Sequence, residues 1–184
     1  DAYIRSDKLV ALYGSHILEF ADERYSESPA AVAFLRACGM QSRPTAVQFA
    51  TAMTTHHARI PTAQTVVKLL KRLFEEIMQV EGRNELLEVL KPVKMFPGKR
   101  NGKLVRGLTV GEICINDNPD FVRKLETKLT IAPPEIESSL RAMGSRPVSE
   151  RVQTSYLLGK VKEYTIKAES LRVVLVNRGP IIVH

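Results

Sequence analysis

The feature that most constrains the fold is a short sequence that occurs twice. Residues 35–46 read LRACGMQSRPTA, and residues 140–150 read LRAMGSRPVSE. In each copy a glycine follows the last periodic position of an expected helix, where glycine adopts a left-handed conformation at no steric cost. A proline that cannot continue the helix and a hydroxyl residue come next. Each copy therefore predicts the end of one helix and the start of another.

The residues around the first copy support this interpretation. Pro29 suits the first turn of a helix over 30–38, and Arg36 suits the helix dipole near its end. Thr45 and Gln48 have the spacing of a capping box for the next helix. In the second copy Gly144 ends a helix that begins near 133–139.

Further helices are expected elsewhere. Pro147 and Ser149 predict a helix over 150–166, and Ser6 predicts one over 7–21 that Gly14 can break. Asn84 is expected to cap a short helix over 85–91. Pro61 and Thr62 begin the longest amphipathic helix, with an apolar side formed by Val66, Leu69, Leu70, Leu73, Ile77 and Val80.

The repeated sequence has two interpretations. Helical hairpins can simply reuse one good turn, or the chain can contain related units in a modular helical array. The separation of Gly39 and Gly144 is much longer than a tetratricopeptide or ankyrin repeat, so no solenoid of those kinds is predicted.

The middle of the chain has a different character. Residues 92–116 contain prolines, glycines and short β-prone runs at 103–110 and 111–115, and Asn101-Gly102 is a strong hairpin signal. Asp117 and Asn118 can cap a helix that starts at Pro119. Residues 171–184 are a second candidate hairpin. We therefore expect an α+β fold, mainly helical, in a single domain over 1–184 that can divide into a helical part, 1–91, and a mixed part, 92–184.

Composition excludes several classes of protein. The chain has 44% hydrophobic and 26% charged residues, which is typical of a folded protein, and 6% aromatic residues, which predicts an aliphatic core. Cys38 and Cys114 are isolated, and both are expected to be reduced and buried. No apolar run reaches the ~20 residues of a membrane span. These features favour an intracellular protein, cytoplasmic or nuclear.

The ends of the sequence predict a piece of a longer protein. The N-terminus, DAYIRSDK, lacks both a start methionine and the basic-then-apolar design of a signal peptide. The C-terminus stops inside an apolar run, PIIVH.

No catalytic motif is recognisable. His56 and His57 are adjacent, so on a helix they diverge and cannot easily share one metal ion. The chain has no GxSxG sequence and no Walker-type phosphate loop. Helix capping accounts for Asp117 and Asp120. We therefore predict no cofactor, no metal and no enzymatic activity.

One stretch carries a ligand signal. The chain has a net charge of +7, and residues 91–110 contain six cations and no acid. The candidate contacts are Lys91, Lys94, Lys99, Arg100, Lys103 and Arg106. Such a cluster can bind nucleic-acid phosphates, an acidic membrane surface or an acidic protein, or it can simply be a solvated loop. Phe96 is its only aromatic residue, so any nucleic-acid contact would be weakly sequence-specific.

The order of several segments carries a family resemblance. The segments are FLRACGMQSRPTA at 34–46, PTAQTVVKLLKRLFEEI at 61–77, LLEVLKPVKMFPGKRNGKLVRG at 86–107, EICINDNPDF at 112–121, LRAMGSRPVSERV at 140–152 and LRVVLVNRGPIIV at 171–183. Together they resemble the region downstream of the Hsp90-type ATPase fold in the sacsin and NO VEIN group of very large eukaryotic proteins. The resemblance covers roughly residues 30–184. It departs at Ser145, where the family has a branched aliphatic residue.

The resemblance implies a scaffold or chaperone-like part of a large multidomain protein, with a protein partner. The family's ATP-binding residues do not lie in this segment, so none is assigned. The alternative is a nucleic-acid-associated module, such as a segment of a viral or cellular polymerase, that binds phosphate through 91–106. A catalytic site without a recognisable motif is the third possibility.

Overall fold

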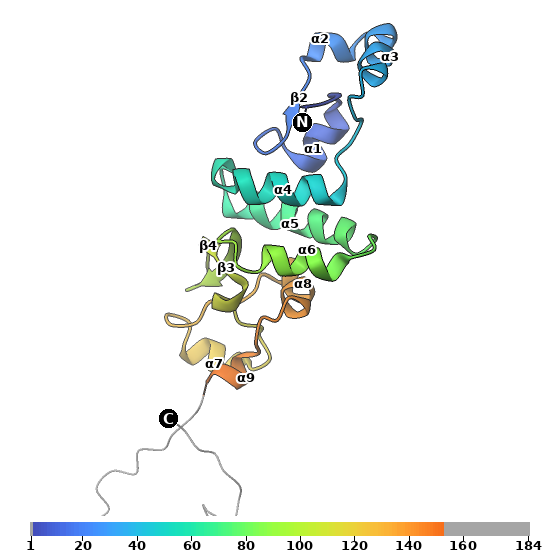
Figure 1. The fold of residues 1–184 in the computed structure, drawn as a ribbon. Helices are drawn as coiled ribbons and strands as arrows, with labels where there is room; N and C mark the ends of the chain where they lie inside the picture. Colours follow the sequence, from blue (N-terminus) through green and yellow to red (C-terminus); the bar gives the residue numbers. More distant parts are fainter. Residues whose placement is uncertain (1, 153–184) are drawn as a thin grey trace, which may run out of the picture.

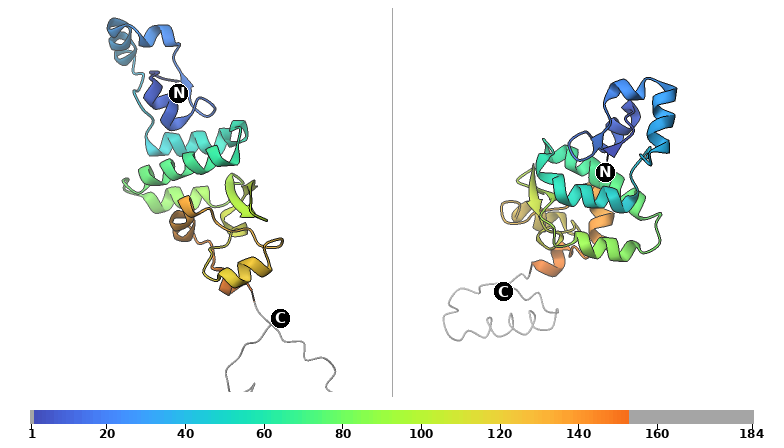
Figure 2. Two further views of the ribbon diagram at one scale, coloured as in Figure 1. Left: turned by 180° about the vertical axis from the view of Figure 1, so that it is seen from behind. Right: turned by 45° about the horizontal axis from the view of Figure 1, so that its top comes forward.

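The computed structural model describes residues 2–152. The helices and strands of this part of the chain are arranged one after another along one long axis (Figure 1). The N-terminal elements lie at one end, a layer of helices crosses the middle, and short strands and helices form the other end. The views in Figure 2 show the same order. The fold is α+β and mainly helical, as the sequence predicts. The candidate hairpin at 171–184 and the predicted helix beyond Val152 lie outside the described residues.

The elements follow the chain from one end of this stack to the other. The first end contains β1 (Ala2–Tyr3), α1 (Asp7–Tyr13), β2 (Glu19–Phe20), α2 (Glu23–Ser26) and α3 (Pro29–Ala37). The middle layer contains α4 (Ala46–His56), η1 (His57–Arg59), α5 (Ala63–Ile77) and α6 (Arg83–Leu90). The other end contains β3 (Phe96–Arg100), β4 (Lys103–Leu108), η2 (Val110–Glu112), α7 (Pro119–Lys124), η3 (Pro134–Ile136), α8 (Glu137–Ala142) and α9 (Val148–Arg151).

Most of the predicted helix starts are confirmed by cap geometry. The side chains of Ser6, Thr62 and Asn118 each accept a hydrogen bond from a backbone N–H in the first turn of α1, α5 and α7. Thr45 and Gln48 form the complete capping box of α4, with bonds of 3.2 and 2.9 Å. These local signals work because a helix leaves its first N–H groups without partners.

Two predicted helix boundaries are wrong, and the break that the sequence allowed at Gly14 is confirmed. The helix from Asp7 ends at Gly14, whose φ of 74° breaks it, so the chain turns and forms β2 before residue 21. Asn84 lies inside α6, which instead begins after Gly82 in a left-handed conformation. α5 ends at Ile77, and Val80 lies beyond it with 36% of its surface exposed.

The predicted hairpin at Asn101-Gly102 is confirmed. Strands β3 and β4 are antiparallel, Arg100 pairs with Lys103, and both turn residues have positive φ, as a two-residue hairpin turn requires. The predicted strand at 111–115 is only partly present. Residues 110–112 form the 3-10 turn η2, and Cys114 and Ile115 make isolated bridges to Ile131 and Pro147.

The two copies of the repeated sequence end their helices with the same pair of hydrogen bonds. The glycine N–H bonds to the carbonyl three residues back, and the next N–H bonds to the carbonyl five residues back, which satisfies two carbonyls that a helix end leaves free. The bonds are Gly39 N to Arg36 O, Met40 N to Leu35 O, Gly144 N to Arg141 O and Ser145 N to Leu140 O, and all measure 2.9–3.0 Å. Both glycines have positive φ.

The similarity extends to the strands beside each copy. In both places a short extended segment pairs in parallel with a segment on each side. The N–H of an isoleucine in this segment, Ile4 or Ile115, bonds to the carbonyl two residues after the glycine. The corresponding bonds are Ala21 N to Tyr3 O and Ile4 N to Gln41 O in the first copy, and Ala132 N to Cys114 O and Ile115 N to Arg146 O in the second. The structure thus contains two units with the same backbone pairing, residues 2–41 and 113–147, which we call unit 1 and unit 2.

The helix after the glycine turn begins differently in the two copies. In the second copy Pro147, and not Ser149, occupies the N-cap position of α9. Asp117 supplies the cap from a distance: its carboxylate accepts the Ser149 N–H at 3.0 Å and also the Ser149 hydroxyl. These bonds hold the pKa of the Asp117 carboxyl below its usual value, the hydroxyl having the larger effect. Asp117 therefore joins the start of α7 to the start of α9.

One apolar core connects the three layers. It includes residues from β1 to Met143. The core is therefore continuous across the boundary between residues 91 and 92, where the sequence allowed a division of the domain into two parts. The seven buried apolar residues of α5 lie at its centre: Val66, Val67, Leu69, Leu70, Leu73, Phe74 and Ile77. Tyr13 joins α1 to this helix through a 2.6 Å hydrogen bond to Glu76. Among the described helices, none is long and apolar enough to cross a membrane.

Candidate functional site

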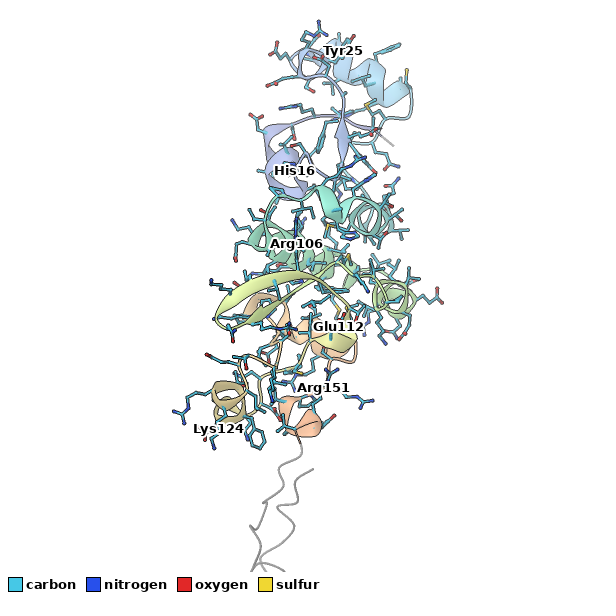
Figure 3. The ribbon with its side chains drawn as sticks, turned by 90° about the vertical axis from the view of Figure 1, so that its left-hand side faces the viewer. His16, Tyr25, Arg106, Glu112, Lys124 and Arg151 are labelled. Carbon is cyan, nitrogen blue, oxygen red and sulfur yellow. The ribbon has the colours of Figure 1, made fainter. Side chains whose placement is uncertain are left out.

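The six cations predicted from the sequence lie on and around the β3–β4 hairpin. Arg100 and Lys103 stand directly opposite each other beside the turn, and Lys99 is paired with Leu104 on the other face. Figure 3 shows Arg106 on this hairpin, with Glu112 below it. The hairpin is thus the predicted basic surface, but its cations have different surroundings.

Three of the six cations bind other groups of the protein through their side chains. Lys91 forms an ion pair with Glu88 at 2.5 Å. Arg100 donates two hydrogen bonds, of 3.0 and 2.7 Å, to the hydroxyl of the buried Thr130. Arg106 donates to the backbone carbonyl of Ile60, which ties β4 to the end of η1. The partners of the two arginines are neutral oxygen atoms, and these bonds fix the positions of the arginine side chains.

The other three cations, Lys94, Lys99 and Lys103, are exposed and make no ion pair or side-chain hydrogen bond with the described residues. One acid lies close to the group. Backbone and hydroxyl bonds from Thr109 lower the pKa of the Glu112 carboxyl, and the charges of Lys94 and Arg100 lower it further. The free basic surface therefore consists of three lysines and is smaller than the sequence suggests.

A groove of about 400 Å³ lies beside the hairpin, between its turn and residues 116–137. Its lining includes Lys99, Asn101 and Asn116 together with the acids Glu126 and Glu137. The charges are mixed, and among the described residues no histidine, cysteine or serine lines the groove. The part of the lining that the structure describes therefore contains no pair of these residues that could act as nucleophile and base.

The side chains of His57 and Asp120, which the sequence analysis considered as possible site residues, have partners within the fold. His57 contacts the Thr54 carbonyl through Nδ1 at 3.0 Å, and His56 is half-exposed beside it. Within residues 2–152, no three His, Cys, Asp or Glu side chains gather as a metal site. Asp120 forms an ion pair with Arg123 at 3.1 Å on the exposed side of α7.

The prediction for the two cysteines is half correct. Cys114 is buried, and this burial raises the pKa of its thiol. Cys38 is exposed, because it is the C-cap of α3, a helix in which no described residue is buried. The sequence offered no way to distinguish the two, since both follow apolar residues.

The structure also reveals a surface that sequence reasoning missed. Helices α2 and α3 form an arm at the end of the molecule and contain no buried residue. Tyr25 and Phe34 expose 52% and 67% of their surface. Figure 3 shows Tyr25 at this end, far from Arg151. The signal was present in the sequence: α3 reads PAAVAFLRA, in which Arg36 is the one polar residue, and a helix apolar on all sides normally lies inside a protein.

Searches with protein-family models, among curated proteins and among solved structures find no match to this chain.

Proposed function

We propose that the chain is a non-catalytic scaffold, a protein-interaction module of a large multidomain protein. The observation that carries this proposal is the α2–α3 arm, whose apolar side chains face solvent. Apolar side chains gathered on one exposed element are typical of protein–protein contact sites. The resemblance to the sacsin and NO VEIN group points to the same class of function.

The test is quantitative affinity purification with Phe34→Asp as the variant. The exposed position makes this change harmless to folding, while a charge placed in an apolar interface opposes binding. We expect specific partners to be reduced about tenfold or more, since such central apolar residues often contribute 2 kcal/mol or more.

Val89→Asp is the matched control, because Val89 is 66% exposed on α6, away from the arm. It should leave the same partners bound. Equal recovery with both variants would remove the arm as the interaction site, and turnover of a substrate by the purified chain would contradict the non-catalytic function.

The basic hairpin supports a second candidate function, binding to nucleic-acid phosphate. Like charges directly opposite each other destabilise a strand pair, yet Arg100 faces Lys103, and Lys99 adds a third cation on the other face of the hairpin. Positive charges kept together at such a cost suit an anionic ligand.

The test is binding to single- and double-stranded nucleic acid over a range of salt concentrations. Replacing Lys94, Lys99 and Lys103 with glutamate should weaken binding, and the slope of log affinity against log salt should fall by about 2–3. The control replaces three exposed lysines elsewhere, Lys8, Lys124 and Lys128, and changes the net charge equally. Equal losses in the two variants would show that the hairpin is not the contact.

A further inference from the structure

The two units of the fold give their corresponding helices different surroundings. Aligned on the glycines that end them, α3 of unit 1 corresponds to η3 and α8 of unit 2 together. In unit 2 the apolar residues of this region, Ile136, Leu140 and Met143, are at most 1% exposed. They belong to the core around α5, which packs against η3. In unit 1 no helix of the described residues occupies the corresponding place.

The residues of α3 that correspond to this buried face are Ala31, Leu35 and Cys38. With Phe34 they have the spacing i, i+3, i+4 and i+7, which places them on one side of the helix. We call these four residues the α3 stripe. All four are half or fully exposed. The α3 stripe has the pattern of a helix–helix contact but lacks the second helix within the part of the chain that the structure describes.

The remaining residues of α3 indicate that more than one side of this helix is suited to burial, in contrast to α8. Helix α8 reads ESSLRA and has polar residues on its outer sides, whereas α3 is apolar apart from Arg36. A helix with one covered side, such as α8, retains a polar side toward water. The composition of α3 is instead that of a helix enclosed by neighbours.

We propose that the α3 stripe is the docking surface for an amphipathic helix of a partner protein that has an aliphatic stripe. The partner helix packs on unit 1 as α5 packs on unit 2. This inference rests on the proposed scaffold function and specifies its contact. Helix α5 itself has the required chemistry, because Leu69, Leu70 and Leu73 belong to its apolar side.

The experiment uses the whole chain, 1–184, and a fluorescent peptide with the sequence of residues 61–80 as the probe. Arg72→Glu in the peptide, joined to Lys68 by a side-chain lactam, keeps it helical. Fluorescence anisotropy measures binding to the wild type, Phe34→Asp and Val89→Asp. We expect saturable binding that is about tenfold weaker for Phe34→Asp and unchanged for Val89→Asp.

Two further measurements identify the contact. The bound peptide should slow alkylation of the exposed Cys38, while the buried Cys114 serves as an internal reference. A peptide with Leu70→Gln and Leu73→Gln should neither bind nor protect Cys38.

Three results would overturn the proposal: no saturable binding of the helical peptide, equal binding to Phe34→Asp and the wild type, or faster alkylation of Cys38 after deletion of residues 153–184. The last would make the chain's own C-terminal segment the occupant. If native partners still depend on Phe34 while the peptide does not bind, the scaffold function stands and the helical partner is wrong.

Discussion

At the scale of single residues, Gly98 in strand β3 has no room for a larger side chain, although its backbone conformation is one that any residue can adopt. A Cβ on Gly98 would lie 2.3 Å from the Thr130 methyl group and 3.0 Å from Leu108. Thr130 is held in place, since it is buried and accepts the Arg100 hydrogen bonds. We expect Gly98→Ala to lower the free energy of unfolding by about 1–3 kcal/mol through overpacking. Urea denaturation measures this loss.

Gly111→Ala is the control for this prediction. Its Cβ would meet only the Thr109 hydroxyl at 3.9 Å, an ordinary contact. The two substitutions add the same methyl group, so a similar stability for both variants would show that the contact with Thr130 relaxes freely.

At the scale of elements, Asp117 shows how one side chain can stabilise a helix far away in the sequence. Asp117→Asn should lower the free energy of unfolding by about 0.5–1 kcal/mol near neutral pH, because the charged cap of α9 is lost. The pKa of the Asp117 carboxyl is lowered in the folded protein. Its charge therefore stabilises the fold above its unfolded value, near 3.8, and this contribution is lost as the pH falls through the lower folded value.

Urea unfolding of the wild type and Asp117→Asn between pH 7 and pH 3 measures this effect. The difference between the two proteins should be constant above pH 5 and shrink toward pH 3. Asp120→Asn is the control, since the ion pair of Asp120 with Arg123 is about three-quarters exposed on both sides. A difference that does not change with pH would contradict a charge-dependent cap.

At the scale of the whole molecule, α5 connects the two units. It contacts α1 and α4 on one side and β3, β4 and η3 on the other. Leu70 is fully buried in this helix. We expect Leu70→Ala to cost about 3–5 kcal/mol and to weaken both units together.

Hydrogen exchange tests this coupling at two corresponding amides. The Ile4 N–H forms a hydrogen bond within unit 1, and the Ile115 N–H forms the corresponding bond within unit 2. Both amides should lose protection from exchange together in Leu70→Ala. Phe34→Ala should leave both unchanged, because the arm contributes nothing to the core. Loss of protection at Ile115 alone would show that unit 1 folds independently of α5.

The sequence by itself determined the local features of this protein. Caps at Ser6, Thr45, Thr62 and Asn118, the turn at Asn101-Gly102 and the helix ends at Gly39 and Gly144 all depend on residues within a few positions of each other. The sequence also predicted the basic stretch, but not that Arg100 and Arg106 hold Thr130 and Ile60. Such partners lie far away in the sequence, so no local pattern contains them.

Only the tertiary structure decided which apolar residues are covered. Cys38 and Cys114 both follow an apolar residue, and α3 and α8 both end in Leu-Arg-Ala, yet one member of each pair is exposed and the other is packed in the interior. Burial is a property of the neighbours that the fold brings to a surface. The backbone pairing that defines units 1 and 2 could not be predicted from the sequence around the two glycines for the same reason. Its hydrogen bonds join residues that lie far apart in the sequence.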